Sequence, residues 1–119
     1  MIKVKVVKNR IRVEISRDKE GFIWQFSVMG HAGFDKLGKD IVCAAVSVTA
    51  YNAVGALQEL VGLKNFYSEK DGYMLCSIPN NLSPESRKIV KVILETTAIG
   101  FKQIELSYRK YVSVLDEEV

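Results

Sequence analysis

The sequence predicts an α+β fold: a two-layer sandwich in which two main helices pack on one face of a mostly antiparallel sheet, in the order β-β-α-β-β-α-β. Three observations support this prediction. Several short segments alternate apolar and polar residues with a period of two, as half-buried strands do. Two turn signals, Asp18-Lys19-Glu20-Gly21 and Lys70-Asp71-Gly72, join such segments in pairs and indicate hairpins. Two longer segments follow the strand pairs and have the apolar spacing of helices.

The first half of the chain begins with strands predicted at residues 11–15 and 22–28, both rich in β-branched and aromatic side chains. Residues 2–6 alternate in the same way, so an extra N-terminal strand within residues 1–10 is also expected. Between residues 29 and 39 the alternation stops and three of the eight glycines occur, which predicts a loop.

The first helix is expected to begin after an N-cap at Asp40 and to end near Leu60, before Gly62. Residues 41–57 form the most apolar run of the chain. This run includes three polar side chains and is shorter than the roughly 20 mostly apolar residues that span a bilayer. We therefore expect a core helix that packs against the sheet, and no membrane partner.

The second half of the chain repeats the pattern. Strands at residues 66–67 and 73–78 flank the second hairpin turn. Ser83-Pro84 predicts an N-cap followed by proline at the first helical position. Apolar spacing continues that helix to about residue 104, with Gly100 as a possible break. Residues 111–115 predict a short final strand.

Composition limits the possible functions. The 119 residues, 48% hydrophobic and 26% charged, suit one globular domain, so residues 1–119 are expected to form a single domain. Two cysteines and one histidine cannot build a tetrahedral zinc site from Cys and His alone, and we expect neither a metal nor a cofactor. Cys43 and Cys76 do not suggest a disulfide framework, and no signal-peptide pattern is visible, so a cytoplasmic location fits best.

The Gly-rich loop is long for so small a fold, and it leads to Cys43 in the predicted first turn of the helix. Unpaired backbone N–H groups and the helix dipole there would favour the nucleophilic thiolate. His31, at the start of the loop, could pair with the sulfur if the loop folds back. On spacing alone, a buried structural cysteine and a surface or hydrogen-bonded histidine are the more common explanation of these two residues.

Four further residues of the loop and helix have two interpretations each. Asp40 is a plain cap or also orients the histidine. Ser47, one turn after the cysteine, bonds to the carbonyl four residues earlier or donates to the sulfur or to an oxyanion. Gly30 and Gly33 are ordinary turn glycines or let the loop close over a peptide.

Basic side chains leave the question of a nucleic-acid partner open. The net charge of +3 is too small to imply such a partner by itself. Basic residues nevertheless gather at both ends of the sequence, where they suit phosphate contacts or a solvated surface: Lys3, Lys5, Lys8, Arg10, Arg12, Arg87, Lys88, Lys91, Lys102, Arg109 and Lys110.

Two short motifs give the sequence a family resemblance. The loop contains Gly30-His31-Ala32-Gly33, and Gly38-Lys39-Asp40-Ile41-Val42-Cys43-Ala44-Ala45-Val46-Ser47 follows. This combination resembles the ribosomal-processing cysteine protease family called Prp, and the resemblance extends over about residues 11–114. It implies a homodimeric bacterial cytoplasmic endopeptidase that removes the short N-terminal extension of a large-subunit ribosomal protein during ribosome maturation.

The resemblance also implies roles for individual residues. Cys43 matches the nucleophile and His31 the general base, Asp40 and Ser47 match supporting positions, and Gly30 matches the hinge of a mobile loop. Backbone amides near Val42 and Cys43 would then bind the oxyanion. Residues 1–10 precede the start of shorter relatives, and no role is assigned to them. The alternative is a non-catalytic, ribosome- or RNA-associated binding module that uses the basic surface.

Overall fold

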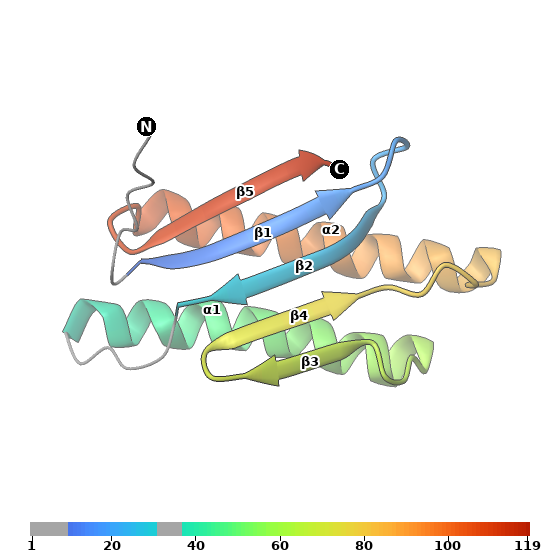
Figure 1. The fold of residues 1–119 in the computed structure, drawn as a ribbon, viewed down its shortest axis with the longest axis horizontal. Helices are drawn as coiled ribbons and strands as arrows, with labels where there is room; N and C mark the ends of the chain where they lie inside the picture. The colour runs from blue at the N-terminus through green and yellow to red at the C-terminus, as the bar shows by residue number, and fades with distance from the viewer. Residues whose placement is uncertain (1–9, 31–36) are drawn as a thin grey trace, which may run out of the picture.

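The computed structural model describes residues 10–30 and 37–119, with the backbone alone at residues 37–40. Five strands form one sheet in the order β3-β4-β2-β1-β5. The strands are β1 (Ile11–Arg17), β2 (Ile23–Met29), β3 (Tyr67–Lys70), β4 (Tyr73–Ser77) and β5 (Val112–Glu118). Two helices cover one face of this sheet (Figure 1): α1 (Leu37–Ala56), which continues into the π-helical turn η1 (Leu57–Val61), and α2 (Pro84–Ser107). The predicted α+β class and element order are confirmed.

The sheet is mostly antiparallel, as predicted, with one parallel pair. Strands β1 and β2, β2 and β4, and β3 and β4 pair antiparallel, whereas β5 pairs parallel to β1. Helix α2 returns the chain to the end of the sheet where β1 begins (Figure 1), so β5 enters in the same direction as β1. The sheet is therefore mixed.

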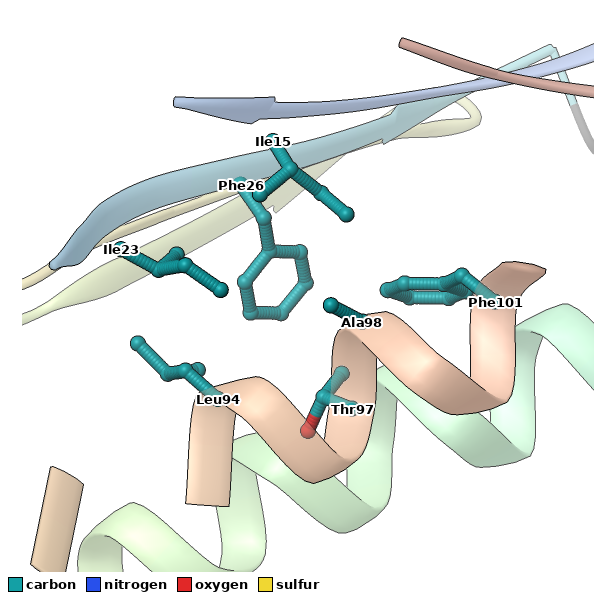
Figure 2. A pocket seen from close by; sticks show the side chains of 7 residues that line it. All are labelled: Ile15, Ile23, Phe26, Leu94, Thr97, Ala98 and Phe101. Carbon is teal, nitrogen blue, oxygen red and sulfur yellow. The ribbon is translucent and has the colours of Figure 1, made fainter. Parts of the chain in front are cut away.

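Strand register places the apolar residues on the helix-covered face. Val13 pairs with Val28 and Ile15 with Phe26, and all four side chains are buried. From the helices, Phe101 meets the ring of Phe26 at a centroid distance of 5.8 Å. Figure 2 shows Phe26 between strand and helix residues at a small apolar depression, lined by Ile15, Ile23, Phe26, Leu94, Thr97, Ala98 and Phe101. The Thr97 hydroxyl donates to the Ile93 carbonyl, so this depression belongs to the core and presents no ligand chemistry.

Helix α1 packs on the sheet as a core helix. By length and composition, the stretch Ile41–Val61 is also long and apolar enough to cross a membrane, a test that core helices of soluble proteins pass as well. Its inner side chains Val42, Val46 and Leu57 are fully buried in the common core, whereas Val48 on the outer face is 58% exposed. The buried face confirms the predicted packing against the sheet.

Two features of the helices differ from the prediction. Helix α1 begins at Leu37, so Asp40 lies in its first turn and is not the N-cap. Gly38 falls in this first turn and not in the middle of the helix, where glycine is destabilising. Helix α2 runs without a break through Gly100, where a Cβ would lie 3.3 Å from the Thr49 methyl group, and this glycine lets the two helices approach closely. The extra strand predicted within residues 1–10 lies outside the described residues, except for Arg10.

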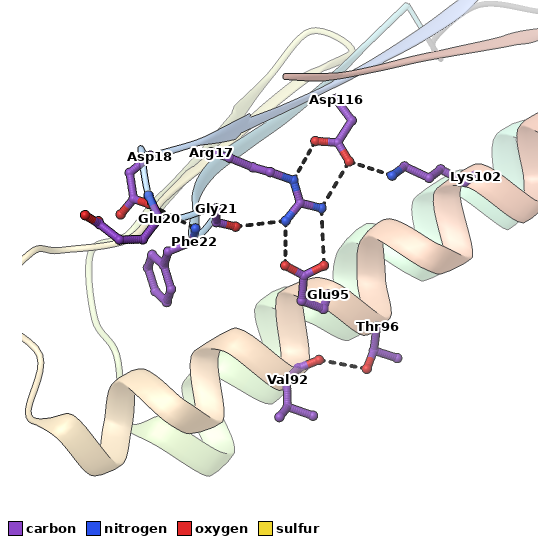
Figure 3. Close-up of polar contacts among 10 residues, drawn as sticks. All are labelled: Arg17, Asp18, Glu20, Gly21, Phe22, Val92, Glu95, Thr96, Lys102 and Asp116. Atoms are coloured by element: carbon purple, nitrogen blue, oxygen red, sulfur yellow. Dashed lines mark hydrogen bonds and ion pairs between the residues drawn. The ribbon is translucent and has the colours of Figure 1, made fainter. Parts of the chain in front are cut away.

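Ion pairs tie the sheet to α2 at the end where β1 and β5 finish. Arg17 donates to Asp116 at 2.8 Å and to Glu95 at 2.5 Å, and Lys102 lies 2.6 Å from Asp116 (Figure 3). At the same end, Arg87 lies over the Phe22 ring, 3.8 Å from its centroid. These contacts connect β1, β5 and α2, and they lie at the opposite end of β1 from the Gly-rich loop.

Candidate active site

The Gly-rich loop leaves the sheet at Gly30, which is fixed by two neighbouring elements. The Gly30 N–H donates to the Gly72 carbonyl at 3.1 Å, in the turn between β3 and β4. Its φ angle is +88°, and a Cβ at this position would lie 2.8 Å from the Arg10 carbonyl oxygen. A side chain would therefore be strained by the backbone angle and would also clash with the backbone of residue 10. Glycine is the residue that fits where the loop begins.

Cys43 lies in the second turn of α1. Helix α1 begins on the side of the molecule where β2 ends (Figure 1). Its side chain is half-buried and packs against the core. Because α1 begins at Leu37, the amides of Val42 and Cys43 donate to helix carbonyls four residues earlier. In this conformation the helix uses both amides, so the oxyanion site expected at them stays a prediction. Cys43 also lies beyond the first turn, where the effect of a helix dipole is strongest.

Ser47 is half-buried one helical turn after Cys43, on the same side of α1. Thr49, two residues later, donates its hydroxyl proton to the Ala45 carbonyl at 2.8 Å, and Thr96 and Thr97 in α2 bond to carbonyls in the same way. Within the described part of the chain, the Ser47 hydroxyl makes no such bond. It is therefore available to a group near Cys43.

Cys76 has the opposite environment. It lies in β4, pairs with Phe26 in β2, and is fully buried. Burial raises the pKa of its thiol to about 12, because the apolar core disfavours the charged thiolate. Cys76 therefore belongs to the core, and its thiol is unreactive in the folded protein.

The other predicted site residues are only partly described. His31 and Gly33 lie outside the described residues, and Asp40 is described by its backbone in the first turn of α1. The structure thus brings Gly30 and the turn between β3 and β4 to the end of the molecule where α1 presents Cys43. In residues 10–30 and 37–119, acidic, histidine and cysteine side chains form no group of three or more that could hold a metal.

The sequence analysis did not identify the contribution of the second hairpin to this site. It predicted Lys70-Asp71-Gly72 as a turn, and Asp71 and Gly72 indeed have positive φ angles of 49° and 80°. The Gly72 carbonyl supports Gly30 because β4 pairs with β2, a contact between strands far apart in the sequence. No local sequence pattern could have indicated this support.

Comparison with known proteins identifies the kind of site. The family model described as cysteine protease Prp matches residues 10–113. The chain belongs to the cysteine protease Prp family. The ribosomal processing cysteine protease Prp of Bacillus subtilis (strain 168) is 32% identical over 101 residues, which cover 83% of this chain and 90% of that protein.

Two solved structures extend the match to the Prp fold. SMU.848 from Streptococcus mutans has a TM-score of 0.80 at 28% identity, over 93% of this chain and 97% of that chain. The Prp protease from S. aureus with a covalently linked product peptide has a TM-score of 0.71 at 25% identity, over 90% and 99% of the two chains. The predicted family and enzyme class are confirmed: the chain is a Prp-family cysteine protease.

Proposed function

We propose that this Prp-family protease removes the short N-terminal extension of a large-subunit ribosomal protein, with Cys43 as the nucleophile and His31 as the general base. The B. subtilis relative is named a ribosomal processing protease, which supports this class of substrate. The observation that supports the nucleophile is the burial of Cys76. A cysteine protease needs a thiolate that substrate can reach. Of the two cysteines in the chain, Cys76 is buried with a pKa of about 12, and Cys43 is half-buried at the start of a helix.

The proposed reaction follows the chemistry of acyl transfer. His31 takes the proton from Cys43, and the sulfur attacks the carbonyl carbon of the scissile bond. The protonated imidazole then gives its proton to the leaving amine, and an acyl-enzyme remains on the sulfur. A water molecule, activated by the same imidazole, releases the acyl group and restores the thiol.

Four further residues have proposed supporting roles. Asp40 lies one turn of α1 before Cys43 and orients His31. The Ser47 hydroxyl, which is not used in a helix bond, donates to the Cys43 sulfur or to the oxyanion. Gly30 and Gly33 are the hinges of the loop, and Gly30 holds its starting point through the contact with Gly72.

Three statements about the whole protein belong to the same proposal. Residues 1–119 form a single protease domain, the protein acts in the cytoplasm, and it is a homodimer. Sedimentation analysis of the purified protein tests the dimer: a species with the 13.4 kDa mass of one chain at working concentrations would contradict it.

Cleavage of the host's own extension peptide, followed by mass spectrometry, tests the proposed function. Wild type and Cys76→Ala are expected to cut one bond, whereas Cys43→Ala and His31→Ala are expected to lose cleavage by about a thousandfold or more. Ser47→Ala should reduce kcat/KM by about tenfold. Thr49→Ala is its matched control, because that hydroxyl bonds to a helix carbonyl, and it should leave kcat/KM unchanged. A Cys43→Ala protein that cuts at the wild-type rate would overturn the proposal.

Family membership favours this enzyme over the non-catalytic binding module, and thiol reactivity separates the two directly. In the folded protein, iodoacetamide should label Cys43 well before Cys76, because one thiol is half-buried and the other fully buried. If the protein is a binding module without catalysis, both thiols should react slowly with iodoacetamide. Labelling of both cysteines after unfolding in denaturant is the control that each thiol is chemically intact.

A further inference from the structure

The described arginines divide into paired and unpaired groups. Arg17 and Arg87, at the end of the sheet distant from the loop, contact carboxylates, and Arg12 lies 2.7 Å from Glu14. Among the described residues, neither Arg10 nor Arg109 has a carboxylate within ion-pair distance. The two unpaired arginines are 99 positions apart in the sequence and lie together in the fold.

A direct hydrogen bond brings these residues together. The Arg10 Nη2 donates to the Arg109 carbonyl oxygen at 2.7 Å, between the start of β1 and the segment that leads from α2 into β5. The side chains of Arg109 and the adjacent Lys110 are exposed. Arg10, Arg109 and Lys110 therefore form a basic cluster at the end of the sheet where the Gly-rich loop begins, since the Arg10 carbonyl also faces Gly30.

One donor atom of this cluster lacks a hydrogen-bond acceptor. The Nε of Arg10 is buried and has no hydrogen-bond partner among residues 10–30 and 37–119. A buried donor without an acceptor is costly, and for a charged group the cost is higher. Because this atom is buried, a ligand would contact the exposed side chains of Arg109 and Lys110, and Arg10 would act by holding the Arg109 backbone in place.

The C-terminus of α2 compensates only part of the positive charge. A helix C-terminus is equivalent to roughly half a negative charge. The nearby Glu105 carboxylate is engaged by the Val114 N–H at 2.8 Å. Together they do not balance the three cations of the cluster. An anion with several charged groups suits this end of the molecule.

We propose that the basic cluster of Arg10, Arg109 and Lys110 binds the phosphate backbone of RNA. Guanidinium groups present paired N–H donors that match two phosphate oxygens. The cluster is an exposed surface and not a closed pocket, which suits a polymer with repeated phosphates better than a single small anion. This inference goes beyond the proposed proteolysis and does not require it: the cluster would hold the enzyme on an RNA-containing substrate particle, with the loop at Gly30 beside the contact.

Binding of a short fluorescein-labelled single-stranded RNA, followed by anisotropy over a series of KCl concentrations, tests the proposal. The double variant Arg109→Gln/Lys110→Gln should weaken binding at low salt by about tenfold or more. It should also reduce the slope of log Kd against log salt by about 1.4, or roughly 0.7 for each lost phosphate contact. Arg10→Gln should weaken binding in the same direction.

The matched control is Lys88→Gln/Lys91→Gln, which removes the same charge from exposed positions on α2. It should retain wild-type binding within about twofold. Equal losses in the two double variants would show a net-charge effect and overturn the proposal, as would the absence of wild-type binding at low salt. Equally tight binding of a poly-glutamate peptide would show a general anion surface and would also overturn it. Cleavage of the free extension peptide is measured in parallel, so failure of the proteolytic proposal is detected separately.

Discussion

At the residue scale, the candidate active-site loop leaves the sheet at Gly30, a position that does not accommodate a side chain. The φ angle of +88° and the Arg10 carbonyl oxygen 2.8 Å from a Cβ both oppose a side chain. We expect Gly30→Ala to destabilise the protein by about 1–3 kcal/mol and to lower kcat/KM by about tenfold or more, because the displaced loop carries the proposed base. Denaturant unfolding and peptide cleavage measure the two effects.

Variants of two other glycines distinguish the cost of the backbone angle from the cost of the clash. Gly21 has a φ angle of +86° with nothing within 4 Å of a Cβ, so Gly21→Ala tests the backbone angle without a clash. It should cost about 1 kcal/mol and leave cleavage unchanged. Gly55 lies inside α1 with nothing within 4 Å, and Gly55→Ala should stabilise the helix by about 0.5–1 kcal/mol. A Gly30→Ala protein as stable as Gly21→Ala would contradict the proposed clash.

Sequence motifs identified the candidate site residues, but their local geometry depended on contacts that no motif contains. The pattern of Gly30, His31, Cys43 and Ser47 indicated a cysteine protease, and the family comparison confirms that class. The reason for a glycine at position 30 became visible only with the start of β1 and the turn between β3 and β4 beside it. Similarly, aspartate is a common N-cap residue, which suggested that a helix begins after Asp40, but α1 begins three residues earlier.

At the scale of an element, α1 combines a buried face with an unusually apolar outer face. Val46 is fully buried against the sheet, and Val48, two residues later, is 58% exposed. We expect Val46→Ala to cost about 1–3 kcal/mol, because it leaves a cavity in the core, and Val48→Ala to stay within about 0.5 kcal/mol of wild type. Denaturant unfolding of the two variants, which delete the same atoms, gives the comparison. Equal losses at both positions would contradict the packing of α1 on one face.

The same element shows what periodicity can and cannot establish. Alternating and helical patterns correctly predicted the hairpins, both helices and their order. The parallel entry of β5 beside β1 was not predicted, because strand direction depends on the path of α2 across the sheet. The continuity of α2 through Gly100 was also uncertain from sequence, since the benefit of that glycine comes from Thr49 on α1.

At the scale of the whole molecule, the ion-pair network around Arg17 joins elements from both ends of the chain. Arg17 in β1 donates to Asp116 in β5 and to Glu95 in α2, and Lys102 contacts Asp116 (Figure 3). The hydrogen bond from Arg17 lowers the pKa of Asp116, and the contact with Lys102 lowers it further. Asp116 is 12% exposed at its side chain, so this pairing is only partly screened by solvent.

This pKa shift predicts a loss of stability in acid. Because the pKa of Asp116 is lower in the folded than in the unfolded protein, the pairing stabilises the fold above the unfolded value of about 3.9. That stabilisation is lost as the pH falls through the folded pKa. Asp116→Asn should therefore cost about 1–2 kcal/mol at neutral pH, where Arg17 loses a charged partner, and should unfold with a weaker dependence on pH below about pH 4.

The neighbouring residue of β5 supplies the control for this prediction. Glu117 is exposed and, two residues from Leu115, lies on the sheet face that the helices leave uncovered, so Glu117→Gln removes an equal charge without touching the network. It should retain the neutral-pH stability of wild type and its full dependence on acid. Denaturant unfolding at a series of pH values compares the three proteins. If Asp116→Asn and Glu117→Gln follow the same curve, the acid response reflects overall charge, and the Arg17 network does not connect the two ends of the chain energetically.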